Sequence, residues 1–169
     1  MLLDAGDTLV DEGSQTWDGD VVSTADLIPG AAELVHELRR RGYPLVLVAD
    51  GPLATFVNVL GAAGLLECFD AVVVSGDIGV EKPHPLMFLT ALDALGVDPA
   101  DYGRVVMVGN NLRRDIAGAN ALDLTTVWMD WAPRRRKVPR TPLQVPDHTI
   151  TVPLELLSIL DALAASAST

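Results

Sequence analysis

Short runs of consecutive apolar residues recur along the chain, with stretches of helical character between them. The runs lie at residues 1–3, 44–49, 71–74 and 105–108, and residues 125–129, which begin with two threonines, are a fifth predicted strand. A run that is apolar at every position is typical of a parallel strand with both faces covered. Because these runs alternate with helical stretches, a parallel sheet with right-handed crossovers is expected. The pattern therefore predicts an α/β, three-layer, Rossmann-like fold with helices on both faces of the sheet.

Helical periodicity is clearest after residue 30. Apolar residues occur there at Ala31, Leu34, Val35 and Leu38, and Gly42 marks the end of the helix. Residues 75–85 have no such period, so we expect a long loop there. Other expected elements are helices at residues 53–63, 86–95 and 112–122, a short strand at 148–150, and a last helix that begins at Pro153 and turns Leu156, Leu157, Leu160 and Leu163 inward.

The spacing of these elements predicts a single domain over residues 1–165, followed by a frayed tail at 166–169. Residues 10–29 are polar and rich in turn-forming residues, which predicts a short flap without a core of its own. Val21 and Val22 are candidates for a hairpin strand in this flap, with Asp18-Gly19 as the turn.

The chain is acidic, with a net charge of −11 over 169 residues and a pI of about 4.4. Nucleic acids and anionic membranes both attract basic surfaces, so neither is expected as a partner. No apolar run approaches the ~18 residues of a membrane span, and the single cysteine, Cys68, excludes an internal disulfide. Asp4 and Asp7 stand where a signal peptide would carry basic residues, which favours a cytoplasmic protein.

Polar side chains follow the predicted strands at the points where those strands end. Asp4 follows the first run, Asp50 the second, and residues 109–115 the fourth, while Lys82 lies in the loop after the third. The carboxyl ends of parallel strands meet at one edge of the sheet, so these groups are expected to share a cleft. A carboxylate there can attack phosphorus, a lysine can neutralise phosphoryl charge, and carboxylate and carbonyl oxygens suit Mg²⁺.

Four segments together resemble the motifs of the haloacid dehalogenase (HAD) superfamily, over nearly the whole chain. Asp4–Leu9 resembles the first motif, Asp-x-Asp-x-Thr-Leu, and the strand that ends at Ala49 stands at the place of the second. Lys82–Pro85 resembles the third motif, Lys-Pro-x-Pro, and Val108–Ala119 resembles the fourth, Gly-Asp-x-x-x-x-Asp-x-x-Gly-Ala. Each motif alone is weak, whereas their order and spacing together are specific.

The resemblance implies a HAD-like fold and phosphoryl transfer through an aspartyl nucleophile, with Mg²⁺ as cofactor. Asp4 would attack the phosphoryl group and Lys82 would stabilise its charge. Asp4, the backbone carbonyl of Gly6, Asn110 and Asp115 would hold the metal. A phosphorylated or otherwise anionic substrate would be contacted by Thr8, Asp50, Gly51, Asn111, Arg134 and Arg135.

Some of these substrate contacts have a simpler alternative role. Asp50 stands where a helix-capping side chain would stand. The basic run at residues 134–137, with Arg140 close behind it, stands out in so acidic a chain, and arginine suits phosphate. The same run also fits a solvated loop whose arginines pair with surface acids.

Three positions depart from the family pattern. Gly6 stands where the family's phosphatases have a second aspartate, a general acid and base whose help is typically worth about 10²–10⁴-fold. Ala49 stands where the second motif has a hydroxyl, and Asn110 stands where the fourth motif has its first aspartate. Asp7 lies one residue after Gly6 and is expected to point in a different direction, so it is not a substitute for the missing acid.

These departures leave three functions open. The first is a phosphatase-type HAD-like hydrolase with reduced or specialised activity, and the second is a HAD fold retained for binding or assembly without turnover. The third is a metal-independent dehalogenase-type hydrolase, although the spacing from Gly109 to Asp115 follows the phosphatase pattern.

The segments 10–30 and 51–81 hold no more than a flap, a helix and a strand, so no cap domain is expected. A capless protein would have an open cleft. Capless members of the family tend to act on large substrates or to use a neighbouring subunit as a lid, so a homo-oligomer is expected as well.

Overall fold

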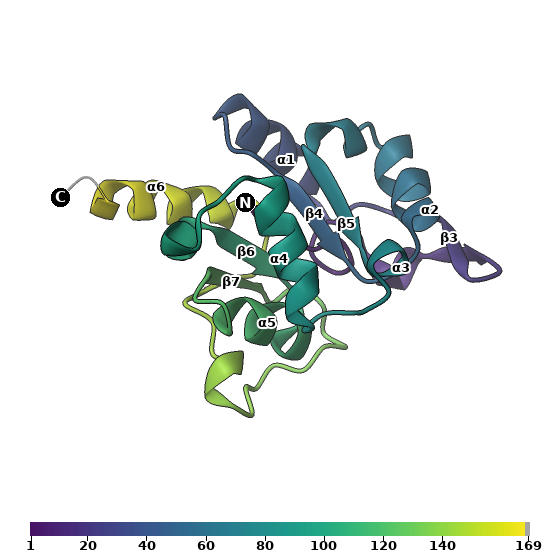
Figure 1. Cartoon of the computed structure of the whole chain (residues 1–169). Helices are drawn as coiled ribbons and strands as arrows, with labels where there is room; N and C mark the ends of the chain where they lie inside the picture. The colour runs from purple at the N-terminus through teal and green to yellow at the C-terminus, as the bar shows by residue number, and fades with distance from the viewer. Residues whose placement is uncertain (168–169) are drawn as a thin grey trace.

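A six-stranded parallel sheet lies at the centre of the computed structural model, which describes residues 1–167 (Figure 1). The strand order is β5-β4-β1-β6-β7-β8, and every neighbouring pair in it is parallel. The predicted α/β fold with a parallel sheet is therefore confirmed. The strands are β1 (Leu2–Leu3), β4 (Val46–Ala49), β5 (Ala71–Val74), β6 (Val106–Gly109), β7 (Thr125–Met129) and β8 (His148–Ile150).

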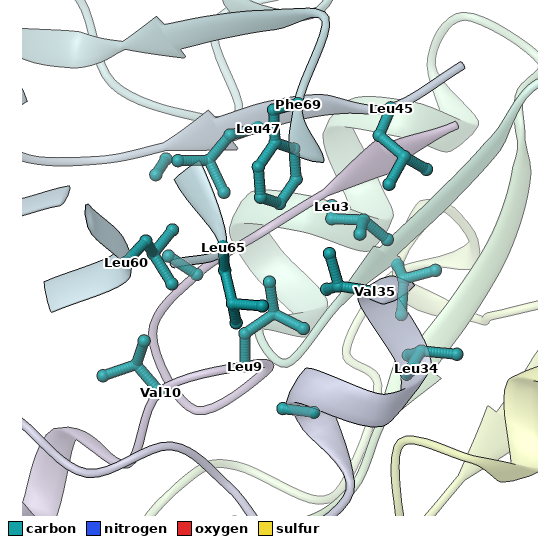
Figure 2. Packing of buried hydrophobic residues seen from close by; sticks show 14 of the residues in the cluster. Leu3, Leu9, Val10, Leu34, Val35, Leu45, Leu47, Leu60, Leu65 and Phe69 are labelled. Carbon is teal, nitrogen blue, oxygen red and sulfur yellow. The ribbon is translucent and has the colours of Figure 1, made fainter. Parts of the chain in front are cut away.

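Both faces of the sheet are buried, which explains why the strands are apolar at consecutive positions. Leu3 and Leu47 belong to one hydrophobic cluster, whereas their neighbours Leu2, Val46 and Val48 belong to a second cluster on the opposite face. Figure 2 shows the first cluster, in which side chains from the sheet, the first helix and the loop after β1 pack together.

Helices cover each of the two faces. Helices α1 (Ala31–Arg40) and α6 (Glu155–Ala167) pack on the face of Leu3, whereas α4 (Pro85–Ala94) and α5 (Ala117–Asn120) pack on the face of Leu2. In Figure 1, α4 crosses in front of the sheet. Within the described part of the chain, no helix has both the length and the apolar character needed to cross a membrane.

The last helix begins later and ends later than predicted. It starts at Glu155 rather than Pro153, because the Glu155 carboxylate accepts hydrogen bonds from the backbone N–H groups of Thr151 and Val152 and so closes the preceding turn. It continues through Ala167, into the segment predicted as a tail, and residues 168 and 169 lie outside the described chain.

The segment predicted as one long loop at residues 75–85 contains a four-residue helix, α3 (Ser75–Ile78). Gly76 permits this short helix to lie close to the preceding loop, because a side chain there would crowd the backbone of Pro52 and Gly51.

Two predicted helices are each split. Residues 53–63 form α2 (Leu53–Phe56) and a π-helical turn (Val57–Gly61), and residues 112–122 form a π-helical turn (Leu112–Ile116) before α5. Short 3₁₀ turns lie at Glu12–Ser14, Leu66–Cys68, Pro99–Arg104 and Pro142–Gln144.

The predicted flap contains an antiparallel hairpin made of β2 (Thr16–Asp18) and β3 (Val21–Thr24). Asp18 closes β2, so the turn is Gly19-Asp20 rather than the predicted Asp18-Gly19. The hairpin docks on α2 through Val22, whose N–H donates to Thr55 Oγ1 at 3.1 Å. Figure 1 shows β3 beside α2 and α3, at the end of the molecule where the carboxyl ends of β4 and β5 lie.

Candidate active site

The residues that follow the strands line one cleft of about 400 Å³ at the carboxyl edge of the sheet. Asp4 follows β1, Asp50 follows β4, and Asn110 follows β6, while Lys82 arrives on the segment after α3. Asp115 reaches the same cleft from the π-helical turn. These five side chains therefore converge in one cleft, as predicted.

Lys82 lies at the centre of the group. Its ammonium nitrogen is 2.6 Å from Asp4 Oδ1, 2.7 Å from Asp115 Oδ1 and 2.8 Å from the backbone oxygen of Val48, which it contacts as a donor. The Lys82 and Asp115 side chains are only 2% and 1% exposed. Hydrogen bonds to Asp4 and Val48, together with the ion pair with Asp115, fix the cation in place.

The electrostatics of this buried group keep Lys82 charged. Burial is the largest influence and by itself lowers the pKa of Lys82, but the carboxylates of Asp115, Asp4 and Asp50 together raise that pKa well above its ordinary value. Burial, followed by the charge of Asp4, raises the pKa of Asp115, whereas Lys82 opposes this rise. Two carboxylates thus depend on one cation for neutralisation.

Asp4 is oriented by Thr8 as well as by Lys82. The Thr8 hydroxyl donates to Asp4 Oδ2 at 2.9 Å, and Thr8 is 3% exposed and does not line the cleft. The Thr8 side chain therefore positions Asp4, and a direct contact between Thr8 and the substrate stays a prediction.

Asp50 is not a helix cap. Helix α2 begins after Pro52 without a side-chain cap, whereas Asp50 Oδ1 accepts from the Lys82 backbone N–H at 2.9 Å and Oδ2 accepts from Arg114 Nη1 at 2.8 Å. Gly51 lines the cleft as predicted and has a φ of 140°, in the range that favours glycine. Asp50 thus fixes the segment that delivers Lys82.

The fourth motif depends on a close approach between Gly109 and Asp115. A Cβ at Gly109 would lie 2.4 Å from Asp115 Cγ, so only glycine lets the carboxylate pack against the end of β6. Asn111 lines the cleft, but its Oδ1 accepts from the backbone N–H groups of Arg113 and Arg114 and so begins the π-helical turn. Asp115 Oδ2 in turn accepts from the Asn111 N–H at 2.8 Å.

The predicted metal ligands supply oxygen donors of the kind that Mg²⁺ prefers. Among the described residues no three His, Cys, Asp or Glu side chains form a metal-binding group, so Asp4 and Asp115 would need neutral oxygens beside them. The Gly6 carbonyl and the Asn110 amide can supply these. Asn110 Nδ2 is buried and has no hydrogen-bond partner in the described chain, so nothing in the protein prevents the amide from turning its oxygen to a cation. This donor set fits a Mg²⁺ ion that keeps several waters.

The basic loop contacts the first motif through Asp7. This residue is fully buried, has a φ of 51°, and pairs with Arg134 and with Arg135, whose Nε lies 2.9 Å from Asp7 Oδ2. Arg134 also approaches Asp11, and Arg135 also pairs with Glu12. Arg135 therefore lines the cleft and Arg134 lines a neighbouring cavity, and the charges of both are already balanced by acids of the chain.

Other arginines surround a second cavity of about 320 Å³ that shares Asn110 and Asn111 with the cleft. Arg113, Arg136 and Arg140 line it, and none of their side chains forms an ion pair with a described residue. The sequence had singled out the basic loop but not Arg113, because one exposed arginine on a helix carries no signal of its own.

Trp17 and Glu12 line the cleft although neither was predicted as a site residue from the sequence. Trp17 on β2 is 60% exposed and lines the cleft, and Glu12 lines it from the turn after the first motif. A tryptophan in a polar flap was a detectable signal, since flaps seldom need so large an apolar group. No sequence signal pointed to Glu12, because it lies within a segment of polar residues.

Comparison with known proteins agrees with this geometry. The haloacid dehalogenase-like hydrolase family matches over residues 1–123. Glyceraldehyde 3-phosphate phosphatase of Methanopyrus kandleri is 36% identical over 136 residues, which cover 80% of this chain and 57% of that protein. The chain spans about half the length of the curated relatives it matches.

Two solved structures support the same assignment. A HAD phosphatase from Thermococcus onnurineus superposes with a TM-score of 0.68 at 34% identity, over 80% of this chain and 59% of that one. The putative HAD-hydrolase YfnB of Bacillus subtilis, bound to magnesium, superposes with a TM-score of 0.68 at 29% identity, over 80% and 56%. The chain therefore belongs to the haloacid dehalogenase-like hydrolase family.

Proposed function

We propose that this chain is a phosphatase-type hydrolase that transfers the phosphoryl group of a monoester first to Asp4 and then to water. The observation that carries the proposal is the setting of Asp4, a buried carboxylate held by Lys82 and Thr8 at the floor of an open cleft. The matched relative from Methanopyrus kandleri, a glyceraldehyde 3-phosphate phosphatase, supports the same class of reaction.

Each residue has a defined task in this reaction. One Asp4 oxygen attacks phosphorus, and the Thr8 hydroxyl holds the carboxylate in the orientation needed for that attack. Lys82, held between Asp4 and Asp115, supplies the fixed positive charge near the phosphoryl oxygens. Mg²⁺, held by Asp4, the Gly6 carbonyl, Asn110 and Asp115, would neutralise further phosphoryl charge.

The substrate is proposed to carry an anionic group besides the phosphate that reacts. Arg113, Arg136 and Arg140 line the neighbouring cavity without ion-pair partners among the described residues, and guanidinium groups bind carboxylates and phosphates through paired hydrogen bonds. Replacing Arg113 and Arg140 by Ser should raise the KM of a bisphosphate or a phosphorylated acid and leave that of phenyl phosphate unchanged. The exposed Arg104→Ser, remote from the cavity, is the control, and equal KM changes for both substrate types would contradict this subsite.

Binding without turnover is the second candidate function. It is favoured by Gly6 and Ala49, which line the cleft without the acid and the hydroxyl that the family's phosphatases have there. Dehalogenase-type chemistry is the third, and it predicts halide release from a 2-haloacid without metal.

Hydrolysis of p-nitrophenyl phosphate with and without Mg²⁺ separates these functions. The wild-type chain should release phosphate in a Mg²⁺-dependent manner, and Asp4→Asn should abolish release. Asp77→Asn, at an exposed acid of α3 outside the cleft, should match the wild type. If a panel of phosphomonoesters is not turned over faster by wild type than by Asp4→Asn, the phosphatase assignment is wrong.

A further inference from the structure

The space beside Gly6 is not empty. A Cβ built on Gly6 would lie 2.1 Å from Glu12 Oε1, 2.9 Å from Glu12 Cδ and 3.1 Å from Glu12 Cγ. Real Cβ atoms essentially never approach other atoms so closely, so the carboxyl group of Glu12 occupies the space into which a side chain at residue 6 would project. A carboxylate is therefore present where the first motif has lost one.

The loop after the first motif holds Glu12 in this position. Glu12 begins a 3₁₀ turn that Asp11 caps by accepting from the Gly13 N–H at 2.7 Å. The Glu12 N–H donates to Asp7 Oδ1 at 3.2 Å, and Asp7 is itself buried between two arginines. The backbone of Glu12 is thus fixed to the same loop that begins at Asp4.

The two oxygens of the Glu12 carboxylate have different surroundings. Oε2 pairs with Arg135, whose Nε is tied to Asp7. Oε1 faces Gly6 and has no hydrogen bond from any described residue. Glu12 and Asp4 both line the cleft, so Oε1 is the carboxylate oxygen that remains available to a group bound above Asp4.

We propose that Glu12 is the general acid and base of this active site, replacing from the following loop the aspartate that Gly6 lacks. The proposal rests on the phosphatase function given above. In the first step an Asp4 oxygen bonds to phosphorus, the ester P–O bond breaks, and the leaving oxygen takes the proton of Glu12. In the second step a water oxygen bonds to phosphorus, its proton passes to Glu12, and the bond from phosphorus to Asp4 breaks. The sum is ester plus water giving alcohol plus phosphate, with both carboxyl groups restored.

The test compares esters whose leaving groups differ in their need for a proton. Glu12→Gln keeps an oxygen that can accept from Arg135 but cannot carry a proton. For an alkyl phosphate, kcat/KM should fall by about 10²-fold or more, because an alkoxide leaves poorly without an acid. For 2,4-dinitrophenyl phosphate, kcat/KM should fall less than about 10-fold, since this leaving group needs no proton.

A second measurement follows the phosphoryl group itself. With ³²P-labelled 2,4-dinitrophenyl phosphate, acid-quenched Glu12→Gln should retain label on Asp4, because water attack lacks its base, whereas wild type should retain little. Asp20→Asn, the same charge change at an exposed residue of the flap outside the cleft, is the matched control and should behave like wild type.

A rescue variant separates chemistry from loop packing. Gly6→Asp combined with Glu12→Ala should recover alkyl phosphate hydrolysis relative to Glu12→Ala alone, because the new carboxyl group takes the space that Glu12 leaves. Equal losses for both esters in Glu12→Gln, or no loss in either, would overturn the role of Glu12 while leaving the phosphatase function standing. An inactive wild-type chain would instead overturn the phosphatase function, and the role of Glu12 with it.

Discussion

The ammonium nitrogen of Lys82 lies 2.6 Å from Asp4 Oδ1, although 78 residues separate the two in the chain. The contact forms because β1 and β4 are neighbours in the sheet, and Asp50 at the end of β4 accepts from the Lys82 N–H. Both side chains are buried, and Lys82 neutralises Asp4 and Asp115 together. Stability and activity are therefore expected to depend on the same contact.

Replacing Lys82 by Met should destabilise the fold strongly. It would leave Asp4 and Asp115 as two buried carboxylates without a cation, at a cost of about 3–5 kcal/mol in the free energy of unfolding. Urea denaturation measures this. Adding Asp115→Asn should recover part of the loss, whereas Lys137→Met, at a partly exposed pair, should cost about 1 kcal/mol or less. A Lys82→Met variant as stable as wild type would contradict the buried triad.

Replacing Gly109 by Ala should displace Asp115 from the cleft. The new Cβ would lie 2.4 Å from Asp115 Cγ, and overpacking of this kind costs about 1–3 kcal/mol. Phosphatase activity should fall along with the melting temperature. Gly61→Ala is the matched control, since a Cβ there meets nothing within 4 Å, and it should leave both quantities near those of wild type.

Replacing Asp7 by Asn should release the basic loop. Asn tolerates the positive φ of Asp7, so the change removes charge without straining the backbone. Loss of the charged hydrogen bonds to Arg134 and Arg135 should cost about 1.5–3 kcal/mol. Limited trypsin digestion should then cut at these arginines faster than in wild type. Asp123→Asn, also at a positive φ but exposed, should leave the digestion rate unchanged.

Replacing Asn110 by Asp should tighten Mg²⁺ binding. A third carboxylate beside Asp4 and Asp115 adds negative charge to the proposed metal site. Since a ligand that binds the folded state raises its stability, MgCl₂ should raise the melting temperature more in Asn110→Asp than in wild type. NaCl of equal ionic strength should not reproduce the difference, and Asp4→Asn should reduce it. An equal response of all three proteins would contradict the proposed ligand set.

The sheet was the most predictable part of the fold. The strand at residues 71–74 has the predicted bounds, because consecutive apolar residues have few alternatives to a strand covered on both faces. Helix α3 was missed because four residues are too few to display a helical period. The π-helical turn at Leu112–Ile116 replaces the first part of the predicted helix. It depends on Asp115 packing against Gly109, a contact that no local pattern reveals.

Some residues of the candidate site were likewise predictable from the sequence, and others were not. Asp4, Lys82 and Asp115 were predictable because strand ends place them, and strand ends are visible in the sequence. The partners of Arg134 and Arg135 were not, because they depend on a positive φ at Asp7 that turns its carboxylate toward a loop more than 120 residues away. Glu12 could be found only from coordinates, since its contact with Gly6 is a matter of shared volume rather than of spacing.

The shared volume beside Gly6 constrains which residues can replace Gly6 and Glu12 during evolution. The Glu12 carboxyl group fills the space beside Gly6, so an acid at residue 6 would require the Glu12 side chain to turn away. A single substitution to an acid at residue 6 would crowd Glu12, and a single substitution of Glu12 by a small residue would leave the space beside Gly6 without a carboxylate. Relatives of this chain should therefore carry one of two pairings, glycine with glutamate or aspartate with a smaller residue, and a motif search that insists on an acid at residue 6 would pass over the first kind.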